Sequence, residues 1–249
     1  MKHRVILWLS VLFLTACSTG PTFYSEDYLA GMASKQFSQL KQEIPVSQDP
    51  EFNKMLQRVA LPISQQVGDR LPNAQWEFVV FDDPSLNAFA MPGGKIGVFV
   101  GLIELVESDD ELAAVIGHEV AHVLLEHSNQ RMSAETLRGA GGILAVIGTK
   151  DMKDSDRNKI LAAYGLGTQV GLMLPYSRGH ESEADREGLL LSARSGFDPR
   201  AAVTFWQKMA QEGGAQPPEF LSTHPSHGTR IENLEAAMPE ALRIYQSTR

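Results

Sequence analysis

Three side chains of one short motif, those of His118, Glu119 and His122, are the best candidates for chemistry in this chain. They form the pattern H-E-x-x-H. On a helix, residues i and i+4 share a face, so the two imidazoles would lie about 6 Å apart and could bind one Zn²⁺. The carboxylate of Glu119, one residue further along, could then reach a water molecule activated by the metal. Seven histidines in 249 residues also allow the pattern to arise by chance, so its context has to decide.

The surrounding residues predict a buried helix over about 109–127. Ser108 and Glu111 have the spacing of a capping box, with Ser108 as the N-cap. Apolar residues then recur at helical spacing, namely Leu112, Val115, Ile116, Val120, Val123 and Leu124. The motif interrupts this apolar pattern, and buried polar groups without partners cost roughly a few kcal/mol each. A metal ion is the simplest partner that would satisfy them.

Two histidines leave a catalytic zinc ion one protein ligand short, because such sites usually combine three protein ligands with one open position. Glu126 continues the series i, i+4, i+8, but residues i and i+8 lie about 12 Å apart along a helix, so one ion cannot bind both ends. Glu181 and Asp185 are better candidates, because they lie four residues apart on a second helical segment. One carboxylate of such a pair could bind zinc while the other accepts a hydrogen bond from a zinc-binding histidine. Taken alone, an acidic cluster of this kind is more often a solvated face.

The elements that must position these residues are mostly helical. Besides the motif helix, the sequence predicts helices over 25–43, 50–68, 131–138, 155–173, 180–195, 199–211 and 229–246. A strand is predicted over 76–81, and residues 87–91 and 95–100 form a hairpin around a Pro-Gly-Gly turn. The expected fold class is therefore α+β, mainly helical, with a small antiparallel β-sheet beside the motif helix and 95–100 as its edge strand.

The first 16 residues have the features of a secretion signal, with a basic start at Lys2 and Arg4 before the apolar segment 5–14. Small residues then precede Cys17, the only cysteine, in a pattern that resembles a bacterial lipobox. This pattern predicts cleavage before Cys17 and its lipidation, and Ser18 favours sorting to the outer membrane. The alternative is an ordinary signal peptide beside an incidental thiol, which would be unusual in an oxidising periplasm. We therefore expect a periplasm-facing lipoprotein of the bacterial cell envelope, with Cys17 as its membrane anchor.

Charge and hydropathy narrow the possible partners. Loss of residues 1–16 removes two of the 22 basic residues and none of the 30 acidic ones, so the net charge becomes about −10. Such a charge argues against a nucleic-acid partner. The apolar run 139–148 (GAGGILAVIG) is too short to span a membrane and too rich in glycine for a clear helix signal. It could be a mobile flap or a lipid-contacting surface, although such runs are more often buried.

Four motifs together resemble the family of membrane-associated zinc endopeptidases that includes HtpX, the CAAX prenyl protease and the mitochondrial Oma-type proteases. They are residues 87–94 (NAFAMPGG), 118–122 (HEVAH), 181–185 (ESEAD) and 224–230 (HPSHGTR). The resemblance covers most of residues 50–235 and is greatest to the periplasmic lipoprotein members of this gluzincin family.

The resemblance assigns roles to the residues at matching positions. The implied ligands of one Zn²⁺ per chain, in a zincin-like fold, are His118, His122 and Glu181. Glu119 is implied to be catalytic, and Asp185 to support the ligands from behind. His224 and Arg230 are implied to lie at the site, where positive donors could stabilise an oxyanion. In some relatives a histidine at the position of His224 can also occupy the open zinc position as an off-switch.

These roles imply peptide-bond hydrolysis by a metalloprotease domain over 50–249, preceded by a tether and helix over 17–49. Glu119 would take a proton from the attacking water and deliver it to the leaving amine. An extended substrate along the edge strand 95–100 would be read mainly through its backbone, which suits unfolded or misassembled envelope proteins. Two alternatives remain open: a zinc-binding but weakly active chaperone or assembly factor at the outer membrane, and a lipoprotein whose histidines are merely buried.

Three other histidines carry weaker expectations. His127 follows the motif helix, and we predict that it caps the C-terminal end of that helix. His180 and His227 are near the predicted site only in sequence, and we predict that both are exposed loop residues.

Overall fold

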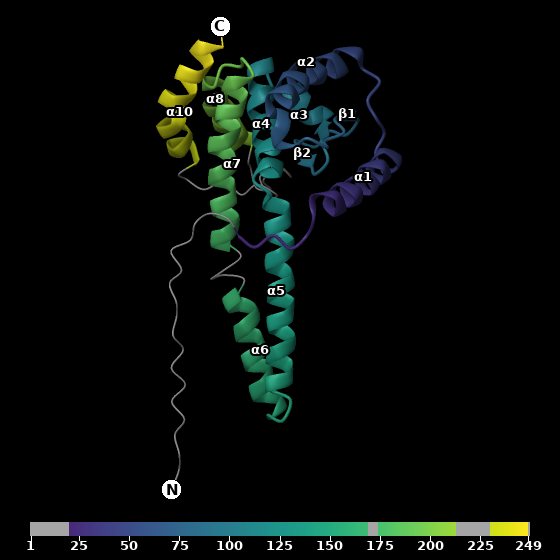
Figure 1. Ribbon diagram of the computed structural model, residues 1–249, viewed down its shortest axis with the longest axis vertical. Coiled ribbons are helices and arrows are strands. Elements are labelled where there is room, and N and C mark those ends of the chain that lie inside the picture. Colours follow the sequence, from purple (N-terminus) through teal and green to yellow (C-terminus); the bar gives the residue numbers. More distant parts are fainter. Residues whose placement is uncertain (1–19, 169–173, 213–229, 249) are drawn as a thin grey trace.

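The computed structural model describes residues 20–168, 174–212 and 230–248, and its fold is α+β and mainly helical. Figure 1 shows a body of packed helices with a small sheet at one side. Two helices, α5 (His127–Gly148) and α6 (Asp154–Thr168), project from this body. The predictions that concern Cys17, His224 and His227 lie outside the described residues.

The sheet is mixed rather than purely antiparallel. Its strands are β1 (Glu77–Phe81), β2 (Ala88–Met91) and β3 (Lys95–Phe99), in the order β1-β3-β2. The predicted hairpin is confirmed, because β2 pairs with β3 in antiparallel register. However, β1 pairs with the other side of β3 in parallel register, so the prediction of β3 as an edge strand was wrong. Four of the five residues of β3 are buried, as expected for a strand at the centre of a sheet.

The turn between β2 and β3 depends on two glycines. Gly93 and Gly94 have φ angles of 80° and 83°, in the left-handed region that side chains with a Cβ rarely adopt. Both also pack tightly, Gly93 against Ala30 and Gly94 against Trp76. The tight turn fixes the antiparallel register of β2, which lies at an edge of the sheet next to α4.

The motif helix is α4 (Asp109–Leu124), and its predicted cap is confirmed. The Ser108 hydroxyl accepts a hydrogen bond from the Glu111 amide at 3.2 Å, and the Glu111 carboxylate accepts one from the Glu107 amide at 2.8 Å. Its buried apolar residues include Leu112, Val115, Ile116 and Val120. The helix therefore runs through the core, with its functional residues inside it.

Two glycines let α4 approach α7 (Leu174–Arg194) at the level of the motif. A Cβ at Gly117 would lie 2.8 Å from the carbonyl oxygen of Gly188, and a Cβ at Gly188 would lie 2.7 Å from the backbone of His118. Neither position has room for a larger residue without movement of one helix. This close approach brings the acidic residues of α7 to the motif.

The remaining elements cover the sheet and complete the core. They are α1 (Glu26–Glu43), α2 (Pro50–Val67), the short 3₁₀ helix Gly68–Arg70, α3 (Val100–Leu105), α8 (Arg200–Glu212) and α10 (Arg230–Ser247). Helix α1 packs Phe37 against Phe81 and Phe89 of the sheet. Helices α2, α7 and α8 pack around α4 with apolar side chains, and α10 packs against α7 and α8.

The two projecting helices are α5 (His127–Gly148) and α6 (Asp154–Thr168), which pack against each other as a hairpin (Figure 1). The prediction of a helix limited to 131–138 was wrong, because α5 continues through the glycine-rich run 139–148. The expectation that this run is buried was also wrong, because Ile143 and Leu144 are 63% and 68% exposed. Within the described ranges, no helix has the length and apolar character required to cross a membrane.

Candidate metal centre

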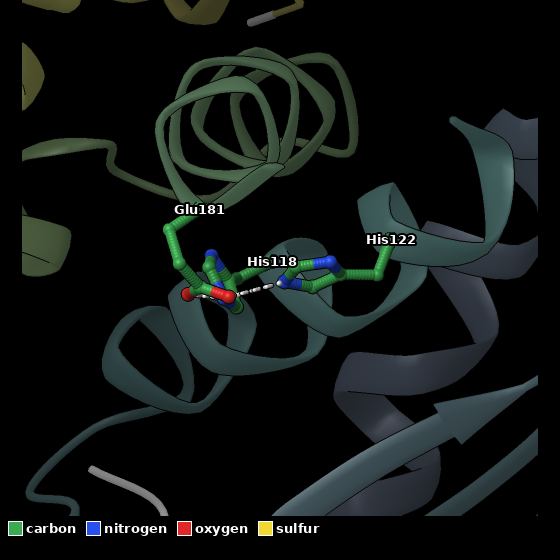
Figure 2. Close-up of side chains that lie close together, drawn as sticks. All are labelled: His118, His122 and Glu181. Atoms are coloured by element: carbon green, nitrogen blue, oxygen red, sulfur yellow. Dashed lines mark hydrogen bonds and ion pairs between the residues drawn. The ribbon is translucent and has the colours of Figure 1, made fainter. Parts of the chain in front are cut away.

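The side chains of His118 and His122 from α4 and of Glu181 from α7 point toward one another (Figure 2). The two histidine Nε2 atoms lie 3.1 Å apart. The Nε2 atoms of His118 and His122 lie 3.4 Å and 3.6 Å from the two carboxylate oxygens of Glu181. All three residues are buried. The structure thus brings together the two histidines of the motif and the glutamate that the resemblance implied as the third ligand.

The separations within this group match the size of a zinc site. Bonds of about 2.0–2.1 Å in tetrahedral geometry place neighbouring ligand atoms about 3.3 Å apart. The three separations of 3.1, 3.4 and 3.6 Å bracket that value. Two imidazoles and one carboxylate are also the donor set of a catalytic zinc site, which leaves one coordination position for water or substrate. The residues present thus fit a zinc ion.

Behind His118, a second acidic residue and an arginine form a buried ion pair. His118 Nδ1 lies 3.0 Å from Asp185 Oδ1, the contact expected of a group that orients a metal-binding imidazole. Arg230 donates to the same oxygen through Nε at 3.0 Å and Nη2 at 2.5 Å. Its guanidinium carbon lies 3.3 Å from the ring centroid of Trp206, so the charge is also held by a cation–π contact.

Arg230 offsets part of the negative charge of the site. Its side chain is 2% exposed, and Nη1 lies 3.6 Å from the Glu181 carboxylate. When His118 is neutral, as metal binding requires, the Glu181 and Asp185 carboxylates and the Arg230 guanidinium leave an excess negative charge that a divalent cation would offset. The predicted role of Arg230 toward an oxyanion stays a prediction, since its contacts in the structure are with Asp185, Glu181, His118 and Trp206.

His118 carries a raised pKa in the metal-free site. Burial and the Arg230 charge both lower this pKa, but the hydrogen bonds to Asp185 and Glu181 outweigh them and raise it to about 9. The imidazole therefore holds a proton at neutral pH when no metal is bound. A metal ion has to displace that proton, because only the neutral imidazole has a lone pair to donate.

A second chain of contacts lies behind His122, and the sequence did not reveal it. His122 Nδ1 lies 2.8 Å from His127 Nδ1, and His127 Nε2 lies 3.2 Å from a carboxylate oxygen of Glu183. If His122 binds the metal through Nε2, its Nδ1 carries the proton and donates to His127. His127 then donates through Nε2 to Glu183, so every nitrogen has a consistent role.

The prediction that His127 caps the motif helix was wrong. Helix α4 ends at Leu124, and Glu126 adopts φ 55° in the left-handed region, which turns the chain. His127 therefore begins α5 and is only 1% exposed. Helical spacing could not indicate its contact with His122, because the two residues lie on different helices.

His180 is likewise buried, on α7, and not an exposed loop residue as predicted. Its ring stacks on that of His127 with centroids 4.0 Å apart, and its Nε2 lies 3.3 Å from Gln130 Oε1. Burial and the Arg131 charge lower the pKa of His180 to about 4. Burial and the neighbouring His180 lower the pKa of His127 to about 3, so both rings are neutral at pH 7.

Glu119 lies on α4 between the two ligand histidines and is 3% exposed. A pocket lined by α1, the β2–β3 turn and the end of α4 reaches His122 from outside. It includes Leu29, Pro92 and Gly93, and thus adjoins the end of strand β2. Of the three residues of the proposed metal centre, His122 alone lines this pocket.

Comparison with known proteins agrees with this geometry. Residues 47–238 match the model of peptidase family M48. The chain is 33% identical over 220 residues to the mitochondrial metalloendopeptidase OMA1 of Schizosaccharomyces pombe, covering 87% of this chain and 63% of that protein. It is 40% identical to the OMA1 metalloendopeptidase of Bos taurus, over 69% of this chain and 34% of the relative.

A bacterial relative is the beta-barrel assembly-enhancing protease of Yersinia pestis, which is 29% identical over 87% of this chain and 45% of its own length. The chain thus spans between about a third and two thirds of the length of these relatives.

Proposed function

The chain belongs to peptidase family M48, and on this premise we propose that it is a zinc metalloendopeptidase of the bacterial cell envelope. The observation that carries the proposal is the buried group of His118, His122 and Glu181, whose mutual separations match those of tetrahedral zinc ligands. These three residues would hold the ion. Zinc would supply Lewis-acid chemistry, activating water and polarising the scissile carbonyl.

Glu119 is the proposed general base. Its place beside both ligand histidines, in a buried position, suits a carboxylate that takes a proton from the attacking water. The same carboxyl group would then give that proton to the amine that leaves. His224 and Arg230 are proposed to stabilise the negative charge that develops on the carbonyl oxygen.

The contacts behind the ligands have a positioning role in this proposal. Asp185 holds His118 by its Nδ1, and His127 holds His122 in the same way. Both imidazoles are thereby kept with Nε2 toward the metal, in the tautomer that binding requires. Arg230 keeps Asp185 in place through two donors to one oxygen.

An extended substrate is proposed to lie along strand β2. In the described residues, β2 is an edge strand beside α4, whereas the outer edge of β1 is partly covered by a bridge between Val46 and Phe81. An edge strand offers unpaired backbone groups to a peptide in extended conformation. Recognition through the backbone favours unfolded or misassembled envelope proteins over one specific sequence, and the pocket beside His122 would take a substrate side chain.

Lipidation of Cys17 is the proposed membrane anchor, with the chain facing the periplasm and held to the outer membrane. Support comes from the sequence, in which a basic start and an apolar segment precede the only cysteine. Metabolic labelling with radioactive palmitate tests this part, because label should enter the parent and not the Cys17→Ser chain.

Cleavage of unfolded casein tests the peptidase proposal. The parent should cleave casein, lose activity to a chelator and regain it with Zn²⁺. Glu119→Gln should lower the rate about 10²- to 10⁴-fold, the range for loss of a general base. The matched control is Glu104→Gln, an exposed residue of α3, which should behave like the parent.

Two results would contradict this proposal. Casein cleavage by Glu119→Gln at the parent rate would refute the assignment of the base. A parent that binds zinc but cleaves no unfolded protein would instead favour the alternative of a zinc-binding chaperone or assembly factor.

A further inference from the structure

The hairpin of α5 and α6 has an unusual surface for a protein in water. Of the twelve large hydrophobic side chains that are exposed in the described residues, eight belong to the hairpin. They are Leu137, Ile143, Leu144, Val146, Ile147, Met152, Ile160 and Leu166. Helix α6 has no buried residue, and the buried residues of α5 end at Ser133. A concentration of exposed apolar residues on one projection indicates a contact surface.

In the contact between the two helices, two glycines of α5 face Tyr164 of α6. A Cβ at Gly141 would lie 2.3 Å from the hydroxyl oxygen of Tyr164, and the same ring adjoins Gly142. The Tyr164 hydroxyl donates to the Arg138 carbonyl at 2.7 Å, which fixes the contact between the two helices. At 100° per residue, the five exposed apolar residues of α5 fall on about half of its circumference, away from this contact. The apolar face is therefore continuous and points away from the partner helix.

The described chain begins at the root of this hairpin. The Gly20 amide donates to Gln130 Oε1 at 2.9 Å, and the Phe23 amide donates to Ser133 Oγ at 2.9 Å. Cys17 precedes Gly20 by three residues, which can reach at most about 10 Å. A lipid on Cys17 would thus bring the membrane surface close to the first turns of α5, from which the apolar face extends.

Length and charge determine how the hairpin can meet a bilayer. Residues 139–149 carry no charge and span about 16 Å as a helix, roughly half of a hydrocarbon core. The segment 150–159 at the tip carries four basic and three acidic residues, which cannot enter hydrocarbon without a large penalty. A hairpin of this kind can lie in the interface, with its apolar face toward the acyl chains and its tip among the headgroups.

We propose that the outward apolar face of the α5–α6 hairpin docks into the interfacial layer of the membrane to which the chain is tethered. The docked hairpin would hold the metal centre at a fixed height, because α5 begins at His127, which contacts His122. Ile143 lies about 24 Å along α5 from His127. The site would then face substrates just above the membrane surface. This inference uses the lipid anchor of the proposed function but not its peptidase activity.

A fluorescent probe on the hairpin tests the proposal in the full lipidated chain. Because Cys17 is the only cysteine and its sulfur would be blocked by the lipid, Leu144→Cys introduces one reactive thiol for the polarity-sensitive dye NBD. The matched control is Leu61→Cys, which replaces another exposed leucine, on α2 and outside the hairpin. In phosphatidylcholine vesicles, the dye at position 144 should emit at shorter wavelength and be quenched by lipids with a nitroxide on the acyl chain. The dye at position 61 should show neither change.

Flotation of the same vesicles separates failure of the anchor from failure of docking. Protein that floats with the vesicles while the dye at position 144 behaves like that at position 61 would overturn the proposal. A shift of the dye emission without vesicles would also overturn the proposal. A shift that grows with protein concentration would indicate that a second copy of the chain covers the apolar face. A shift that follows addition of unfolded casein would indicate that a client protein covers it. Casein cleavage by each labelled chain tests the peptidase function independently, because that assay needs no membrane.

Discussion

The metal centre and the α5–α6 hairpin both depart from the usual pattern of apolar residues inside and charged residues outside. The centre buries charged groups such as Glu181 and Arg230, each at most 2% exposed, whereas the hairpin exposes apolar groups such as Leu144. Both arrangements cost folding free energy, through desolvation of charge in one case and hydration of apolar surface in the other. Neither improves the stability of the isolated chain. Under the two proposals above, a cation in the core and the interfacial layer of a membrane outside would offset these costs.

The two regions differ also in how their costs are offset. In the centre, the Arg230 guanidinium contacts the carboxylates of both Asp185 and Glu181. In the hairpin, the apolar side chains have no such compensation within the described chain. Single substitutions in the centre should therefore lower stability or zinc affinity. Single substitutions on the apolar face of the hairpin should have little effect on the protein in solution and should matter only at a membrane.

The largest expected contrast concerns stability. Leu191→Ala on α7 removes a buried side chain and should lower the free energy of unfolding by about 2–5 kcal/mol. Leu144→Ala is the same substitution at an exposed position of α5 and should change it by less than about 0.5 kcal/mol. Urea unfolding of both variants measures the difference. An equal loss in both would mean that Leu144 is packed in solution, which contradicts the exposed hairpin.

A smaller effect is expected for zinc affinity when the support of a ligand is removed. Asp185→Asn takes away the carboxylate that contacts His118 and should weaken zinc binding about 10- to 100-fold. Asp156→Asn on α6 makes the same change at an exposed residue of the hairpin and should leave the affinity unaltered. Competition with a chromophoric chelator measures both. Equal affinities for the two variants would show that Asp185 does not support zinc binding.

The affinity for zinc should change gradually with pH, because zinc competes with a proton at His118. The hydrogen bonds of His118 to Asp185 and Glu181 outweigh burial and the Arg230 charge, so its pKa is about 9 without metal. Below that pH the imidazole binds a proton that zinc must displace, so affinity should rise about tenfold per pH unit between 7 and 9 and then level off.

The same shift has the opposite effect on the metal-free protein. The pKa of His118 is about 9 in the folded protein and 6.5 ordinarily, so proton binding to His118 stabilises the fold. This stabilisation is complete below pH 6.5 and is lost as the pH rises through about 9. Zinc affinity and the free energy of unfolding of the metal-free protein, both measured between about pH 6 and 10, check that the first rises and the second falls with pH. A zinc affinity that does not change between pH 7 and 9 would contradict the protonated His118.

Much of the fold was predictable because its signals are local. The cap at Ser108, the proline at the start of α2 and the Pro-Gly-Gly turn between β2 and β3 each act over a few residues. Strand order was not predictable in this way. The position of β3 between β1 and β2 depends on pairing with a strand 18 residues away, as in Glu77 with Lys95, and hydropathy alone does not indicate which neighbour a strand has.

The site was predictable where spacing on one helix decides geometry. His118 and His122 follow from i and i+4 on α4, and Glu181 and Asp185 from the same spacing on α7. His127 was missed because the chain turns at Glu126, so its contact with His122 crosses between helices. The helical form of 139–148 was missed for a related reason, since its glycines weaken a helix locally and yet let α6 pack closely.

The proposed metal centre draws its three ligands from two helices, so the zinc content of a set of matched variants is the decisive measurement. Elemental analysis should find one zinc per chain in the parent, in Glu104→Gln and in Glu119→Gln, and a strong loss in Glu181→Gln. A Glu181→Gln protein that retains zinc as tightly as the parent would contradict the assignment of α7 to the metal centre.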